Sequence, residues 1–92
     1  MTYAVFDEGQ TVHGDAEAIL ERIRAEAAQN NDEVKSMTTA DYADALIEDA
    51  PYMLPNDLLG AFEKEDFPSK YDRALAYLSA YPTSGVRILS AR

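Results

Sequence analysis

The stretch Met37–Asp66 most strongly constrains how this chain can fold, because two prolines interrupt its helical pattern. Apolar residues recur at helical spacing before Pro51 and again after Pro55. Proline lacks a backbone donor and disfavours helical backbone at the residue before it, so we expect the first helix to end at Ala50. Pro55 stands where the first turn of a second helix tolerates proline. The stretch therefore predicts two short helices joined by the apolar bridge Tyr52–Leu54.

Each of these two helices has one apolar side. Thr38 and Asp41 form a loose capping box at the start of the first helix. The spacing directs four of its residues inward: Tyr42, Ala43, Leu46 and Ile47. The second helix runs from Asn56 to about Lys64, and we expect its inward side chains to be Leu58, Leu59 and Phe62. Gly60 either weakens this helix by about 1 kcal/mol relative to alanine or lets another backbone approach closely.

The N-terminal segment predicts a β-hairpin with the three-residue loop Asp7–Gly9. Two β-prone runs flank the loop, Tyr3–Phe6 and Thr11–His13. Gly9 supplies the positive φ that a type I turn followed by a bulge requires. This register sets Val5 opposite Thr11, and the side chains expected to face the core are Ala4, Phe6 and Val12.

Two more helices and a last strand complete the predicted elements. Asp15 is a good N-cap for a helix that ends at Gln29–Asp32 and carries an apolar stripe of Ala16, Ile19, Leu20, Ile23 and Ala27. Another helix begins after Ser69, and its stripe consists of Tyr71, Ala74, Leu75, Leu78 and Tyr81, with Tyr77 off that stripe. We expect Val86–Leu89 to form a strand that adds to the hairpin. Residues 33–37 are compatible with a loop, a helical extension or an edge strand.

This order of elements predicts a single α+β domain spanning residues 1–92. Its small antiparallel sheet comprises the N-terminal hairpin and the C-terminal strand, with about four helices packed on one face. A chain of 92 residues has no room for a second domain of ordinary size. The alternative fold is a helical bundle with a small β patch at its end.

The net charge of −9 is unevenly distributed along the chain. Residues 32–66 carry ten acids and two bases, whereas residues 67–92 carry one acid and four bases. Such a surface repels phosphate backbones and anionic lipids, so we expect neither direct nucleic-acid binding nor membrane binding. A basic protein partner is compatible with the charge. The alternative is that the acidity serves solubility alone.

The residues that usually carry out catalysis or bind cofactors are scarce. The chain has no cysteine, and His13 is its one histidine. Zinc, calcium and phosphate-loop motifs are absent, and no serine is flanked by the glycines of a nucleophile elbow. We therefore expect a non-enzyme without cofactor or metal; an enzyme centred on His13 is the less favoured alternative. The N-terminal residues lack the pattern of a signal peptide, which makes the cytoplasm the expected location.

The central stretch holds the residues most suited to protein binding. Asp41, Asp44 and Glu48 follow one another at helical spacing. Tyr52 and its neighbour Met53 either contact a partner or plug the gap between the two helices. The predicted partner-binding residues are Asp41, Asp44, Glu48, Asp49, Tyr52, Asp57 and Glu63, which could form one acidic face together with Glu65 and Asp66.

Two functional hypotheses follow from this surface. The first is an interaction module whose carboxylates bind a basic protein or a nucleic-acid-binding complex. Its sharpest form is an inhibitor that mimics nucleic acid, as anti-CRISPR or anti-restriction proteins do, and small acidic proteins of phages and other mobile elements include such inhibitors. The second is a structural or assembly protein that forms homodimers through Tyr52, Met53 and a sheet edge.

Overall fold

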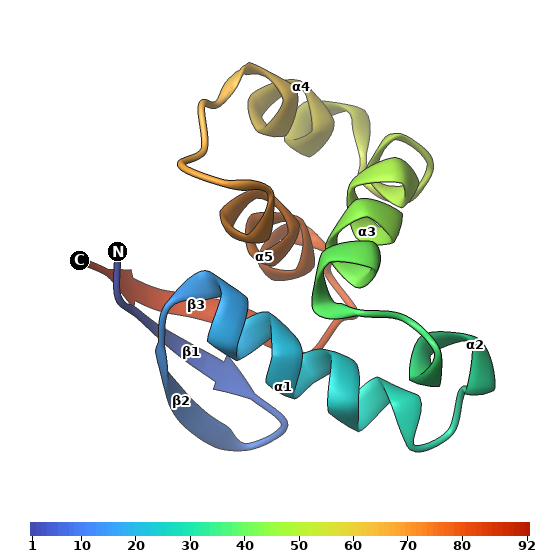
Figure 1. Ribbon diagram of the computed structural model, residues 1–92. Helices are drawn as coiled ribbons and strands as arrows, with labels where there is room; N and C mark the ends of the chain where they lie inside the picture. The colour runs from blue at the N-terminus through green and yellow to red at the C-terminus, as the bar shows by residue number, and fades with distance from the viewer.

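The computed structural model describes all 92 residues and contains three strands and five helices (Figure 1). In chain order they are β1 (Tyr3–Asp7), β2 (Gln10–Gly14), α1 (Ala16–Ala28), α2 (Asp32–Lys35), α3 (Thr39–Met53), α4 (Asn56–Lys64), α5 (Lys70–Ala80) and β3 (Val86–Ala91). The sheet is antiparallel in the order β2-β1-β3, so the predicted α+β class and the pairing of the last strand with the hairpin are confirmed. The additional helix is α2, a single turn that begins at Asp32 and continues into the ambiguous segment 33–37.

The hairpin loop is one residue shorter than predicted. Only Glu8 and Gly9 lie outside the strands, and both have positive φ values, 49° and 84°. Two positive φ angles define a two-residue turn that matches the twist of the strands. Val5 therefore lies opposite Val12, not opposite Thr11, and the predicted register was wrong by one residue.

This change of register reverses the faces of β1. Side chains alternate along a strand, so a slip of one residue moves every side chain to the other face. The core face of β1 carries Tyr3, Val5 and Asp7, whereas the predicted core residues Ala4 and Phe6 lie on the opposite side and Phe6 is exposed. Of the predicted core residues in the hairpin, only Val12 packs against the core.

Helices α1 and α5 cover this core face of the sheet (Figure 1). Asp15 accepts a 2.8 Å hydrogen bond from the Ala18 amide, which satisfies a free donor at the start of α1. The buried stripe of α1 is Ala16, Ile19, Leu20 and Ile23, and that of α5 includes Ala74, Leu75 and Leu78, as the sequence predicts. Burial of one such leucine or isoleucine stabilises the fold by about 1.5–3 kcal/mol.

Pro51 does not end α3, contrary to the prediction. The helix continues for three residues beyond Ala50, and the Leu54 amide donates to the Ala50 carbonyl over 3.0 Å. Pro51 lies in the last turn, where loss of one backbone donor leaves only one helical hydrogen bond unmade. Ala50 is fully buried, so packing holds its backbone helical despite the proline that follows.

Helix α4 lies away from the sheet and packs on α5 (Figure 1). Phe62 is the buried residue of α4. The Phe62 ring centroid lies 5.8 Å from that of Phe67 and 6.5 Å from that of Tyr77. Tyr77 is thus buried and not off the apolar face, because α5 is covered by the sheet on one side and by α3 and α4 on another. Leu58 was expected inside but is exposed. A Cβ atom at Gly60 would meet nothing within 4 Å, so no other backbone approaches this glycine closely.

Candidate functional site

The carboxylates predicted to bind a partner are all exposed on α3 and α4. Between Lys35 and Lys64 the chain carries six acids and neither lysine nor arginine. We call these six residues the α3–α4 acidic surface: Asp41, Asp44, Glu48, Asp49, Asp57 and Glu63. Because the segment contains no positive charge, ion pairing within it cannot neutralise the surface.

The structure brings some of these residues together and separates others. Asp41, Asp44, Glu48 and Tyr52 recur at the spacing of one face of α3, so they form a single stripe. Asp49 flanks this stripe, and Asp57 lies in the first turn of α4, shortly beyond the end of α3. Asp41 begins the stripe roughly 16 Å from Tyr52, at a rise of about 1.5 Å per residue. Glu63 lies at the far end of α4, and Glu65 and Asp66 lie exposed in the connection to α5.

Two carboxylates of the surface have partners within the fold. Asp41 accepts a 3.3 Å hydrogen bond from the Thr38 amide and completes the capping box of α3. The Asp44 carboxylate forms a 3.2 Å ion pair with the Lys70 ammonium at the start of α5. The remaining four form no hydrogen bond or ion pair, and these are Glu48, Asp49, Asp57 and Glu63.

Apolar side chains are exposed where α3 meets α4. Tyr52 is 87% exposed and Met53 45% exposed, so neither plugs the gap between the helices. Leu54 is the buried residue of this connection. Leu58, in the first turns of α4, adds a third exposed apolar side chain. The junction thus combines an exposed aromatic ring with free carboxylates, a composition that suits a protein interface.

Glu21 forms contacts within the fold and does not belong to the α3–α4 acidic surface. The Arg24 guanidinium donates two hydrogen bonds, of 3.0 and 2.7 Å, to the Glu21 carboxylate. The Thr39 hydroxyl, at the start of α3, donates to the same carboxylate. The hydrogen bonds from Arg24 and then Thr39 lower the pKa of Glu21 to about 2. This contact links α1 to α3.

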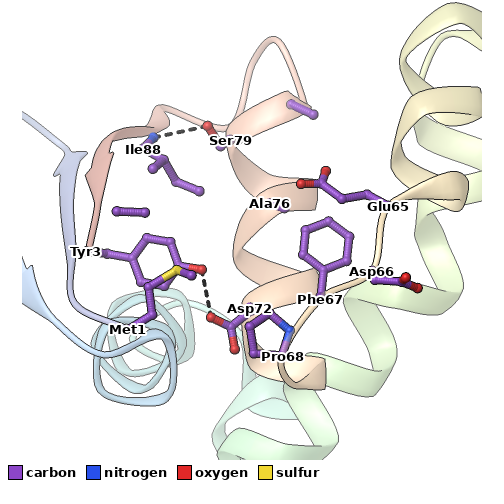
Figure 2. A pocket seen from close by; sticks show the side chains of 12 residues that line it. Met1, Tyr3, Glu65, Asp66, Phe67, Pro68, Asp72, Ala76, Ser79 and Ile88 are labelled. Atoms are coloured by element: carbon purple, nitrogen blue, oxygen red, sulfur yellow. Dashed lines mark hydrogen bonds between the residues drawn. The ribbon is translucent and has the colours of Figure 1, made fainter.

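A hollow of about 450 Å³ lies between β1, β3, α5 and the connection before α5 (Figure 2). On its floor the Tyr3 hydroxyl donates a 2.7 Å hydrogen bond to Asp72 Oδ1. Ser69 Oγ donates to Asp72 Oδ2 over 2.5 Å, so both carboxylate oxygens of this buried residue are satisfied. Burial and the bond to Asp72 raise the pKa of Tyr3 far above its ordinary value. Tyr3 therefore remains a donor at all ordinary pH values and cannot act as a base.

The remaining walls of this hollow are mostly apolar, and the ring of Phe67 projects into it in Figure 2. Ser79 lies on the α5 wall and accepts a 3.0 Å hydrogen bond from the Ile88 amide. Because Tyr3, Asp72 and Ser79 are engaged within the fold, the arrangement ties β1 and β3 to α5. Two further carboxylates, Glu65 and Asp66, line the same hollow from the connection before α5.

Sequence reasoning did not identify the role of Asp72. The capping pattern Ser69-Lys70-Tyr71-Asp72 is visible in the sequence, and the structure confirms Ser69 as the N-cap of α5. The hydrogen bond from Tyr3 to Asp72 could not be foreseen, because the predicted register directs Ala4 and Phe6, and therefore not Tyr3, toward the core. A hairpin register with two loop residues would have placed Tyr3 on the same face as α5.

His13 lies exposed on the edge strand β2 and forms no hydrogen bond or ion pair. No group of three or more histidine, aspartate or glutamate side chains is close enough to hold a metal ion. None of the helices combines the length and apolar character needed to cross a bilayer.

Comparison with protein-family models, with curated proteins and with solved structures finds no match for this chain.

Proposed function

We propose that the protein is a small, non-enzymatic interaction module that binds a basic protein through the α3–α4 acidic surface. Tyr52 carries this proposal, because it is 87% exposed and follows Glu48 by one helical turn on the same face. A tyrosine buries a large area on binding and loses little side-chain entropy. Burial of Tyr52 would supply affinity, while the free carboxylates around it would select a partner rich in lysine and arginine.

The sharper form of the proposal is an inhibitor that occupies a nucleic-acid site on its partner. Carboxylates spaced along a helix can accept the arginine and lysine contacts that a phosphate backbone otherwise receives. The absence of any lysine or arginine between Lys35 and Lys64 supports this form, because Lys70, which pairs with Asp44, is the one cation that contacts these carboxylates. In this proposal the protein acts in the cytoplasm, on a nucleic-acid-binding protein or complex.

The test uses two variants with the same net charge. The first reverses Glu48 and Asp57 to lysine on the proposed surface; the second reverses Glu17 and Glu33, which are exposed on α1 and α2. Asp41 and Asp44 are left unchanged because one caps α3 and the other pairs with Lys70. Both variants and the wild type are used to capture partners from a lysate of the native host at low and high salt.

We expect the wild type to capture a specific basic partner at low salt and to lose that partner as the salt concentration rises. The Glu48/Asp57 variant should lose that partner, and the Glu17/Glu33 variant should keep it. Capture that does not respond to salt, or that both variants lose equally, contradicts binding through this surface.

Self-association is the alternative function, and the exposure of Met53 beside Tyr52 favours it. β2 also presents an unpaired sheet edge, on which a second copy could add a strand. This alternative predicts a dimer in light scattering at micromolar concentration and a monomer for Tyr52→Ala. A wild-type protein that remains monomeric removes it.

A further inference from the structure

The sheet has a second face, opposite the one that α1 and α5 cover (Figure 1). We call it the outer face. Residues that lie directly opposite each other on neighbouring strands share a face of the sheet, so the strand register identifies its members. The outer face consists of two cross-strand rows, Thr11–Phe6–Arg87 and His13–Ala4–Ser90, together with Leu89.

Two large apolar side chains are exposed on the outer face. Phe6 is 41% exposed, and Leu89, the extra residue at the bulge of β3, is 53% exposed. Leu89 follows Ile88, which packs against the core, so the alternation of side chains directs Leu89 to the outer face. The solvated face of an antiparallel sheet is ordinarily polar. Phenylalanine and leucine at neighbouring positions of that face indicate a surface that another molecule covers.

The outer face is positively charged in a protein whose net charge is −9. The three strands contain a single acid, Asp7, and its side chain is buried on the core face. Arg87 takes part in none of the three ion pairs of the fold, and neither does Arg92, which follows the last strand. Arg92 and His13 line one hollow of about 320 Å³. The outer face can therefore meet carboxylates without adding any of its own.

The α3–α4 acidic surface has the complementary composition. Four of its carboxylates form no ion pair within the fold. Of the six large apolar side chains that are exposed in this chain, three lie where α3 meets α4 and two lie on the outer face. The two surfaces lie on different parts of the molecule, since α4 lies away from the sheet (Figure 1). One surface can thus meet the other only between two copies.

We propose that the outer face of one copy binds the α3–α4 acidic surface of a second copy. Arg87 would meet the free carboxylates, while Phe6 and Tyr52 would bury apolar area. The net charge of each copy opposes association, but the Debye length is about 8 Å at about 0.15 M salt, so charges outside the contact are largely screened.

This contact joins copies head to tail, because each copy contributes a different surface. It covers the surface that the proposed function assigns to a basic partner, so self-association and partner binding exclude each other. That exclusion rests on the proposed function, whereas the contact between copies does not.

The experiment measures the mean mass of the purified protein by sedimentation equilibrium at rising concentrations, in about 0.15 M salt. We expect the wild type to exceed the mass of a dimer, because a head-to-tail dimer still has one free surface of each kind. Arg87→Glu and the Glu48/Asp57 variant should each remain monomeric. An equimolar mixture of these two variants should form one-to-one dimers and nothing larger, since each variant keeps the surface that the other lacks.

Lys35→Glu is the matched control for Arg87→Glu. Lys35 is exposed on α2 and forms no ion pair, so its reversal changes the net charge equally without altering either surface. This variant should associate as the wild type does. Formation of dimers in the mixture also shows that both of the other variants are folded.

Three results would overturn the inference. A wild type that stays monomeric would leave the outer face to an acidic segment of another protein. Variants that remain monomeric when mixed would indicate a symmetric contact, such as pairing between two β2 edges. Loss of association in Lys35→Glu would indicate an effect of net charge alone. Because no basic partner is present in this experiment, its failure is independent of the capture experiment that tests the proposed function.

Discussion

The Tyr3 hydroxyl donates a 2.7 Å hydrogen bond to Asp72 Oδ1 and joins the first strand to the last helix, 69 residues away in sequence. Asp72 receives its second bond from Ser69, at the N-cap of the same helix. Three side chains thus satisfy one another where β1, α5 and the connection before α5 meet.

Removal of the Tyr3 hydroxyl should destabilise the fold. Tyr3→Phe leaves a buried carboxylate oxygen of Asp72 without a donor, which costs about 1–3 kcal/mol of unfolding free energy. Urea denaturation measures this loss. Tyr71→Phe is the control, because the Tyr71 hydroxyl makes no hydrogen bond, and it should unfold as the wild type does. The raised pKa of Tyr3 adds a second expectation: stability is retained below the ordinary tyrosine pKa of about 10 and falls above it, and Tyr3→Phe flattens that fall.

Gly60→Ala should stabilise the protein. Gly60 lies inside α4, and a Cβ at this position meets no atom within 4 Å, so alanine gains helix propensity without a clash. The expected gain is about 1 kcal/mol, which raises the melting temperature of a domain of this size by roughly 4–8 °C. Gly9→Ala, at φ 84° in the hairpin turn, should instead lower it. Unchanged or reduced stability of Gly60→Ala would show that the glycine has a role in contacts outside α4.

The attachment of α4 should depend on a single aromatic side chain. Phe62 is 7% exposed and lies between Phe67 and Tyr77, with the Arg73 guanidinium 5.4 Å from its ring centroid. Phe62→Ala should lower the unfolding free energy by about 3–5 kcal/mol, and hydrogen exchange should show early opening of α4. Tyr52→Ala removes an exposed ring and should change stability by no more than about 0.5 kcal/mol. Similar losses from both variants would contradict the difference in burial.

Asp7→Asn should make the fold more stable at neutral pH. The amide replaces a buried carboxylate beside the carboxyl group of Glu26 and can donate to it, so we expect a gain of about 1–3 kcal/mol. The raised pKa of Glu26 determines how this gain depends on pH. In acid, Glu26 is protonated and the wild-type pair costs little, whereas the pair lowers the unfolding free energy as pH rises through the raised pKa. The stability gained by Asp7→Asn should therefore increase with pH. Urea denaturation from acid to neutral pH measures it, with Glu17→Gln as the control. A loss of stability at neutral pH would contradict repulsion between the Asp7 and Glu26 carboxylates.

The Glu21–Arg24 contact should be visible in a pH titration. Carboxyl NMR should find the pKa of Glu21 near 2, and Arg24→Ala should return it toward the ordinary value. Since the folded-state pKa is lowered, the stabilisation is present above the ordinary pKa and is lost as pH falls through the lowered one. Arg22→Ala should leave Glu21 unchanged, because Arg22 pairs with Glu26. A wild-type Glu21 that titrates at its ordinary pKa would contradict the bidentate geometry.

Most elements of this fold could be predicted because local chemistry determines them. Asp15, Thr38 and Ser69 are capping residues, and each begins a helix as the sequence predicts. The exposure of the acidic residues on α3 also followed from helical periodicity. These signals act over three or four residues, so they do not depend on the rest of the fold.

The remaining features depend on contacts distant in sequence. The hairpin register depends on whether Asp7 belongs to the strand or to the loop. In the structure Asp7 belongs to β1, and its side chain is buried among residues of α1, α3 and α5, which are distant in sequence. Tyr77 is buried because α3 and α4 both pack on α5. Packing around Ala50 similarly outweighs the local effect of Pro51. For the same reason, the candidate α3–α4 acidic surface could be predicted, whereas the buried position of Asp7 could not.

The central position of β1 has a consequence for how the nascent chain folds. One edge of β1 pairs with β2, which begins three residues after β1 ends. The other edge pairs with β3, which is translated more than seventy residues later. While the intervening helices emerge from the ribosome, that edge offers unpaired backbone groups to any other strand. Completion of the sheet must therefore follow translation of β3, and until then this edge of β1 stays open to pairing with another strand.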